Sequence, residues 1–265
     1  MSDPMQNLND AADALNQVAA RAAGFYDDAD AEIATRQAAY DALAANLRAV
    51  VGVEMNFLAY VDPDEANPTN VDGGTFTSIS AAVDAAPRGA LVNIYLAPGK
   101  EHVLSHYVYV RHRRLTFLKN GAGANPVIRH AVVANATHNS LYGFTMSDGG
   151  AVRAGSIDFV LDDKADAGLP WSNNKTAFAY ANAGRTEVEL VSCKVTGNAE
   201  QGITSAYTGN QVRIGMWSTT LDGPFNAVVS VTSGLASISH GAVTLLNGAA
   251  LNDGGTLGTN LLKTS

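Results

Sequence analysis

The 265-residue sequence contains one cysteine, Cys193, and this count excludes a framework of disulfide bonds. No run of 18 apolar residues occurs, so we expect no membrane insertion. Only 16% of the residues are charged, and they form no basic stripe of the kind that nucleic-acid binding requires. The segment Met1 to Asp10 lacks the basic start and apolar run of a signal peptide, which predicts synthesis in a cytoplasm.

Motifs for metals, phosphates and activated nucleophiles are also missing. The six histidines form no helical pair and no Cys/His cluster, so we predict no zinc site and no metal. No phosphate-binding or nucleophile-elbow motif occurs in a useful context, so we expect no cofactor. The net charge of −8 is concentrated in residues 1–72, which hold thirteen acids and three bases. Cys193 occupies a predicted strand position, where we expect it to pack as a small apolar residue.

The sequence instead contains a repeat near its C-terminal end. Two-strand patterns of alternating apolar residues begin at Thr186, Gln211 and Leu235, and the turn residues that follow lie at 197, 222 and 247. The step is therefore 25 residues. A fixed period in this range is typical of a solenoid, in which each repeat buries its apolar face only against its neighbours. Short alternating strands separated by Gly, Asn and Asp corners predict a parallel β-helix with one coil per repeat.

Residues 6–51 predict one long helix, because they are rich in alanine and contain no proline. Apolar residues recur every seven positions, and a stutter of eleven joins two halves that stay in phase. This narrow seam favours a coiled coil over a helix packed on its own domain, although alanine in the seam does not distinguish a dimer from a trimer. The seam residues are Leu8, Leu15, Val18, Phe25, Ile33, Tyr40, Leu43, Leu47 and Val50.

Residues 61–74 contain two prolines and several acids and asparagines, which predicts an extended linker and a domain boundary. We therefore divide the chain into a helical stalk or docking segment (1–60), a linker (61–74) and a β-helix domain with a C-terminal cap (75–265). The cap would be a segment from Gly254 to Leu262 that folds across the end of the column.

The start of the β domain resembles the N-terminal start of pectate-lyase-like right-handed β-helices. A short helix stopped by Pro87 is followed by an alternating strand that ends at Pro98-Gly99. In that family the short helix plugs the open end of the solenoid, and the resemblance covers residues 73–251. The residues that carry it are Phe76, Ile79, Ala82, Val83, Ile94, Leu96, Pro98 and Gly99.

A helical stalk followed by an acidic linker and a β-helix resembles a bacteriophage tail fibre or tailspike. The resemblance implies a homotrimer on the virion, made in the host cytoplasm, whose N-terminal part docks on other tail or baseplate proteins. The expected fold is therefore mainly β: a right-handed parallel β-helix preceded by a long N-terminal α-helix that forms a trimeric coiled coil. The resemblance implies no particular activity.

Two weak candidates for catalysis are Asp158 and Glu189. Glycoside hydrolysis needs two carboxylates that face each other across the substrate, and these two are predicted on neighbouring coils. The alternative is that outward acids simply form a solvated strand face. The acidic segment from Asp162 to Asp166 offers oxygen ligands to a cation, but its spacing matches no defined calcium loop and is also ordinary for a polar loop.

Candidate ligand-binding residues are aromatic or basic. Trp171 lies in an irregular stretch that interrupts the coil period, so it is either a sugar contact or an anchor in a subunit interface. Tyr107 and Tyr109 share one strand face. Arg111 and Arg113 belong to a basic spot that would hold an anionic glycan, or would pair with acids of the next chain.

The sequence thus predicts a structural virion appendage that adheres to a host-surface glycan or supports further fibre assembly. Two alternatives remain open at this point. One is a tailspike depolymerase that cleaves a host-surface polysaccharide, and the other is a non-viral adhesin. The identities of the host, the receptor and the virion partner have no signature in the sequence.

Overall fold

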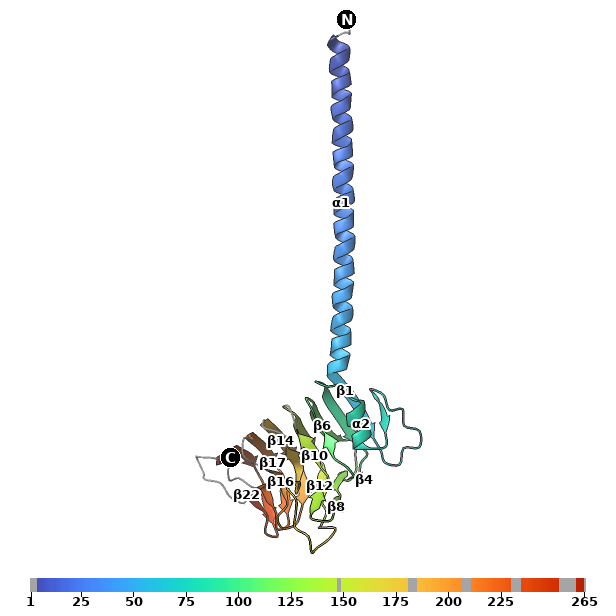
Figure 1. Ribbon diagram of the computed structural model, residues 1–265. Helices are drawn as coiled ribbons and strands as arrows, with labels where there is room; N and C mark the ends of the chain where they lie inside the picture. The colour runs from blue at the N-terminus through green and yellow to red at the C-terminus, as the bar shows by residue number, and fades with distance from the viewer. Residues whose placement is uncertain are drawn as a thin grey trace. The chain divides into compact units, whose positions relative to one another are not determined.

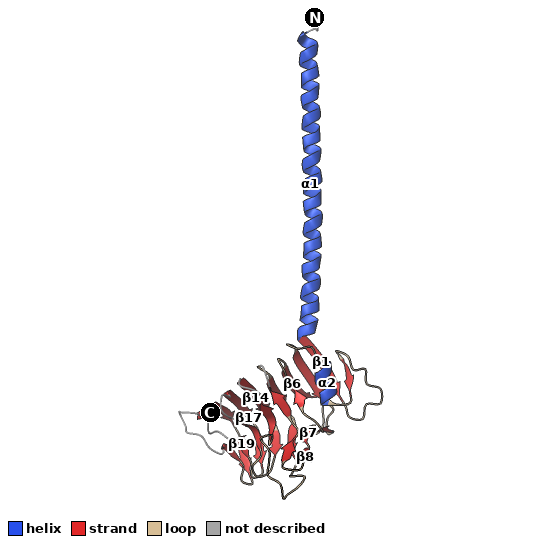
Figure 2. Cartoon of the chain, viewed as in Figure 1, coloured by secondary structure: helices blue, strands red, loops and turns tan. Residues whose placement is uncertain are grey.

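The computed structural model describes residues 4–146, 149–180, 185–205, 211–229, 235–252 and 261–264, without the side chains of residues 4–7, 45–54, 179–180 and 261–264. The chain divides into two compact units, Met1–Val53 and Glu54–Ser265. The first is helical and the second is mainly β (Figures 1 and 2).

The N-terminal unit is formed by α1 (Pro4–Met55), which confirms the predicted long helix. Pro4 is its first residue, a position where the missing N–H costs no hydrogen bond. Leu47 and Val50 lie in α1, but their side chains lie outside the described residues. The other seam side chains are 55–71% exposed: Leu8, Leu15, Val18, Phe25, Ile33, Tyr40 and Leu43.

The second unit contains three parallel sheets. Sheet 1 has the order β2 (Gly74–Phe76), β1 (Asn56–Val61), β3 (Leu91–Leu96), β6 (Arg114–Lys119), β11 (Ala151–Gly155), β14 (Arg185–Val191), β17 (Gln211–Trp217), β20 (Leu235–Gly241) and β23 (Leu261–Thr264). Sheet 2 has the order β21 (Thr244–Leu246), β18 (Thr220–Asp222), β15 (Lys194–Thr196), β12 (Asp158–Leu161), β7 (Val127–His130) and β4 (Glu101–Leu104). Sheet 3 has the order β22 (Ala250–Asn252), β19 (Asn226–Val229), β16 (Gly202–Ser205), β13 (Thr176–Tyr180), β10 (Phe144–Met146) and β5 (Val108–Tyr109). A separate antiparallel pair joins β8 (Val132–Ala134) to β9 (Asn139–Leu141).

From β14 onward the chain visits sheets 1, 2 and 3 in turn and then returns to sheet 1 beside its earlier strand. Arg185 pairs with Gln211, and Gln211 pairs with Leu235, so the successive steps are 26 and 24 residues. In sheet 3, Gly202 pairs with Asn226 and Asn226 with Ala250, two steps of 24. The strand pairing therefore confirms the repeat of about 25 residues.

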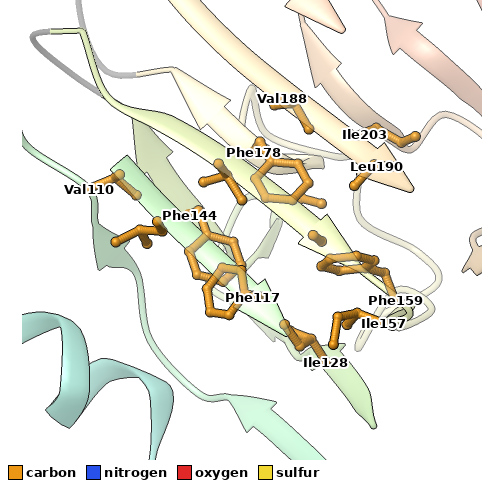
Figure 3. Close-up of a cluster of buried hydrophobic side chains, with 14 of the residues drawn as sticks. Val110, Phe117, Ile128, Phe144, Ile157, Phe159, Phe178, Val188, Leu190 and Ile203 are labelled. Atoms are coloured by element: carbon orange, nitrogen blue, oxygen red, sulfur yellow. The ribbon is translucent and has the colours of Figure 1, made fainter. Parts of the chain in front are cut away.

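The three sheets share one hydrophobic core (Figure 3). Phe117 of sheet 1 lies 5.2 Å from Phe144 of sheet 3, measured between ring centroids. Phe144 stacks on Phe178 at 5.4 Å, and Phe178 contacts Phe159 of sheet 2 at 5.8 Å. Paired side chains also form continuous buried rows across the strands, because parallel pairing in register places like positions side by side. One such row in sheet 1 is Val92, Leu115, Val152, Val188, Ile214 and Ile238.

The corner between sheets 1 and 2 has the same backbone form in four successive passes. Ser156, Ser192, Ser218 and Ala242 have φ between 50° and 57°, a left-handed conformation that is uncommon outside glycine. The backbone N–H of each of the three serines donates to a carbonyl of the next pass, at 2.8–3.0 Å. Cys193 follows Ser192 and is buried, as expected, and burial raises the pKa of its thiol to about 11.

The helix α2 (Ile79–Ala85) packs at the N-terminal end of the β unit, as predicted for this segment. Its first turn is capped by Ser78, whose hydroxyl accepts a hydrogen bond from the backbone N–H of Ala81 at 3.2 Å. Ile79, Ala82 and Val83 are buried in the shared core. These apolar residues at helical spacing explain why the helix lies against the first strands.

The division of the chain differs from the predicted boundaries 1–60, 61–74 and 75–265. The break between units falls at Val53/Glu54, and residues 56–61 form β1, which pairs with β2 and β3 in sheet 1. Phe57, Ala59 and Val61 alternate inward, so this strand belongs to the core and the segment 62–73 connects two strands of one sheet. Most of the predicted cap lies outside the described residues, and β23 extends sheet 1 beside β20.

Candidate ligand-binding site

The longest interruption of the regular passes surrounds Trp171. Residues 162–175 connect β12 to β13, whereas the equivalent connections in the next two passes are only 197–201 and 223–225. Arg129 fixes the start of this insert, because its guanidinium binds Asp162 at 2.7 Å and Glu101 at 3.3 Å. Asp162 is therefore engaged by an arginine, and no group of acids, histidines or cysteines in the described ranges is arranged to hold a metal.

A buried amide, Asn139 at the start of β9, holds the insert in place. Its Nδ2 donates to the carbonyls of Asp166 and Leu169 at 2.8 and 3.0 Å, and its Oδ1 accepts from the backbone N–H of Asp166 at 3.0 Å. Backbone bonds from Asn139 to Pro170 and from Ser172 to Asn139 continue the connection. Because the amide satisfies three buried backbone groups, the segment that carries Trp171 has a defined position.

A second buried amide, Gln201, fixes the short connection that faces the insert. Its Nε2 donates to the carbonyl of Asp162 at 2.6 Å, and its Oε1 accepts from the backbone N–H of Asn198 at 2.6 Å. The side chain of Asn198 donates to the carbonyl of Leu161 at 3.3 Å. Glu200 in this connection has a φ of 70°, a strained value for a residue with a side chain.

These two segments enclose an open pocket of about 300 Å³. Lys164 lies 5.9 Å from the centre of the Trp171 ring and forms an ion pair with Glu200 at 3.3 Å. The lining residues are Asp163, Lys164, Ala167, Trp171, Asn198 and Glu200. An aromatic surface beside polar groups of both signs suits a sugar, because the ring stacks on the apolar face of the sugar and the polar groups bind its hydroxyls.

The structure does not bring Asp158 and Glu189 together. Asp158 lies in sheet 2, where its carboxylate accepts a hydrogen bond from Asn125 at 3.0 Å. Glu189 lies in sheet 1, 3.6 Å from the guanidinium of Arg153. Each candidate thus has a separate polar partner on a different sheet, which is the arrangement of a solvated strand face and not of a catalytic pair.

Arg113 has an internal role. Its guanidinium donates to the carbonyl of Ala86 at 2.7 Å and to that of Pro87 at 3.2 Å, just beyond the end of α2. Carbonyls at a helix end lack partners within the helix, and a cation there is also favoured by the helix dipole. Arg113 is only 9% exposed, and burial lowers the pKa of its guanidinium. It is therefore not accessible as the predicted ligand contact.

The other predicted contacts form a separate surface. Tyr109 is exposed, and the guanidinium of Arg111 lies 4.8 Å from the centre of its ring. The hydroxyl of Tyr107 accepts a hydrogen bond from Asn174 at 3.0 Å, and its ring contacts Tyr142 edge-on. Tyr107 thus supports the end of the insert, and only Tyr109 and Arg111 remain free to contact a ligand.

The sequence singled out Trp171 but not the two buried amides or the pairing of Lys164 with Glu200. No local signal marks Asn139 or Gln201, because their burial depends on segments about 30 to 40 residues away. No protein-family model, curated protein or solved structure matches the chain. Within the described residues, no helix is long and apolar enough to cross a membrane.

Proposed function

We propose that the β unit is a right-handed parallel β-helix. Pairing steps of 24 and 26 residues, a left-handed corner repeated in four passes, and buried rows that run across sheet 1 support this architecture. The helix α2 occupies the end at which the resemblance to pectate-lyase-like β-helices expects a plug.

The seam of α1 carries the functional proposal. A helix that exposes seven large apolar side chains along one heptad stripe is stabilised when copies of it pack together. We infer that the chain forms a homotrimer through α1 and serves as a virion appendage of the phage tail fibre or tailspike type. In this role α1 attaches to the tail, the β unit faces the host surface, and the Trp171 pocket binds a surface glycan.

The mass of the native particle tests the oligomer directly. We expect three copies for the unaltered chain and one copy for a variant with Leu15→Lys and Leu43→Lys, because two charges then lie in the seam. The matched control places Ala20→Lys and Ala38→Lys on the opposite face of α1, where we expect three copies to persist. A monomeric unaltered chain at micromolar concentration would remove the proposal.

Binding to purified bacterial surface polysaccharides tests the pocket. Trp171→Ala removes the stacking surface, so we expect the affinity for a bound polysaccharide to fall at least tenfold. Tyr109→Ala alters the separate surface formed with Arg111 and should leave the affinity unchanged. The reverse ranking of the two variants would move the glycan site to Tyr109.

One observation favours a second function for the same pocket, which is hydrolysis of the bound glycan. Asp163 and Glu200 both line it, and glycosidases act through two carboxylates. The ion pair with Lys164 favours the charged form of Glu200, the form that a nucleophile or base requires. New reducing ends from a polysaccharide, lost in Glu200→Gln, would establish this activity, and their absence across bound polysaccharides would leave adhesion as the function.

A further inference from the structure

One outward-facing row of sheet 1 carries no charge along its whole length. Tyr60 of β1 stacks on Tyr95 of β3 with ring centroids 5.4 Å apart, and the same register continues strand by strand to β20. The row is Tyr60, Tyr95, Leu118, Gly155, Val191, Trp217 and Gly241. We call it the apolar row. Its side chains point away from the core, because their strand neighbours Leu96, Phe117 and Met216 point inward.

Trp217 lies flat on the surface of the sheet. Its indole covers Gly215 of the same strand so closely that a Cβ at Gly215 has no room, and Gly241 of the next strand contacts its edge. Only glycine at 215 allows this position. The outer face of the ring remains bare, and Trp217 is 40% exposed. A flat aromatic surface in the middle of an uncharged row is the composition of an interface core.

The rows beside the apolar row carry charges of both signs. Arg153 pairs with Glu189 at 3.6 Å, and Arg213 pairs with Glu187 at 3.5 Å. A hollow of about 230 Å³ lies among these side chains, over the small residue Ala151. A face that meets copies of itself needs both signs, because a face of one sign would repel its copies. This face has an apolar centre and a mixed polar rim.

The occupant follows from the connection to α1. The helix ends at Met55 and β1 begins at Asn56, so no linker separates the seam from the first strand of sheet 1. Copies joined through α1 therefore keep their β units at a high effective concentration. At ~4.8 Å between strands, a row over seven strands is about 30 Å long, and three outward rows cover roughly 600 Å². This area is below the ~800 Å² per partner of a standard interface, so the face needs the helices to assemble.

We propose that the outward face of sheet 1, centred on the apolar row, is a second interface between copies of this chain. The inference rests on the proposed homotrimer. It adds that the β units contact one another through sheet 1 and that Trp217 is buried when the helices associate. Sheets 2 and 3 then remain on the outside, with the Trp171 connection between them free to bind.

Fluorescence of Trp217 tests the proposal in the full chain. The protein has two tryptophans, so Trp171→Phe leaves Trp217 as the only reporter. In this background we expect acrylamide quenching of Trp217 to be at least threefold weaker in the trimer than after the added seam changes Leu15→Lys and Leu43→Lys. A trimer by mass in which Trp217 is quenched as strongly as in the monomer would overturn the interface but not the trimer. A monomer by mass would overturn both.

A second pair of variants tests the face without relying on fluorescence. Val191→Lys places a charge in the apolar row, and we expect the concentration at which trimers dissociate to rise at least tenfold. Val103→Lys is the matched control, because Val103 is exposed on sheet 2. Equal dissociation of the two variants would contradict the proposal. Unchanged secondary structure by circular dichroism shows that both have folded.

Discussion

The helical unit and the β unit place their large apolar side chains in opposite environments. In α1, Phe25 is 71% exposed, whereas Phe178 in β13 is enclosed by aromatic rings from sheets 2 and 3. The β unit can bury its apolar surface within one chain, because three sheets face a common core. A single helix has no such interior, so its stability depends on other molecules. Intramolecular and intermolecular packing are therefore separated along the sequence.

The same substitution in the two units gives the largest expected contrast. Phe178→Ala removes a ring from the shared core and should lower the free energy of unfolding of the β unit by about 3–5 kcal/mol. Phe25→Ala should leave the unfolding of the β unit unchanged and weaken only the association of copies. Denaturant unfolding followed by circular dichroism and native mass would separate the effects, and equal losses of β-unit stability would contradict the contrast.

Acid should weaken the β unit through His130. This side chain is fully buried among Phe144, Phe159 and Phe178, and its Nδ1 donates to the carbonyl of Tyr142 at 2.9 Å. Burial lowers the pKa of His130 from 6.5 to about 4. The unfolded chain therefore binds a proton at a higher pH than the folded chain, so stability is complete above pH 6.5 and falls as the pH drops toward 4.

We expect a loss of about 3 kcal/mol between pH 7 and pH 4 from this group. His130→Leu should remove that part of the pH dependence, whereas His106→Gln at an exposed position should retain it. Unfolding free energies measured across this pH range would check the assignment. A variant His130→Leu with the same pH dependence as the unaltered chain would show that another group is responsible.

A smaller effect is expected where the β unit supports its surface. Asn139→Ala leaves two carbonyls and one N–H of the insert without their side-chain partner, and should cost about 2 kcal/mol. The fluorescence of Trp171 should shift as the insert moves, and polysaccharide binding should weaken. Asn120→Ala, at an exposed position, is the control. An unchanged Trp171 signal in Asn139→Ala would show that the insert is held by its backbone alone.

The sequence predicted best where the passes are most regular. Between Thr186 and Leu251 the alternation and turns recur at a nearly fixed step, so the pattern reveals the pairing. Earlier passes pair at steps such as 37 from Arg114 to Ala151, because loops are inserted, and no fixed period is visible there. β11 was not predicted, because Ala154 is the small residue opposite Phe117 in its row and leaves little hydrophobic signal.

The candidate site was predictable only in part. Trp171 was identified because it interrupts the period, which a linear sequence displays. Arg113 was assigned to ligand binding because its neighbours are basic, but its position is decided by the carbonyls of Ala86 and Pro87, which are 26 and 27 residues away. Contacts of this length are set by which strands become neighbours, and composition alone does not encode them.

The left-handed corners at Ser156, Ser192, Ser218 and Ala242 have one further consequence. Since every turn of the chain enters and leaves its layer with the same geometry, a whole layer can be gained or lost without altering those that remain. Excision of residues 211–234 would place Ala236 beside Thr186 and Ile238 beside Val188, positions already occupied by side chains of similar kind. The height of this protein is thus a property that duplication and deletion of DNA can change in discrete increments, while its ends stay the same.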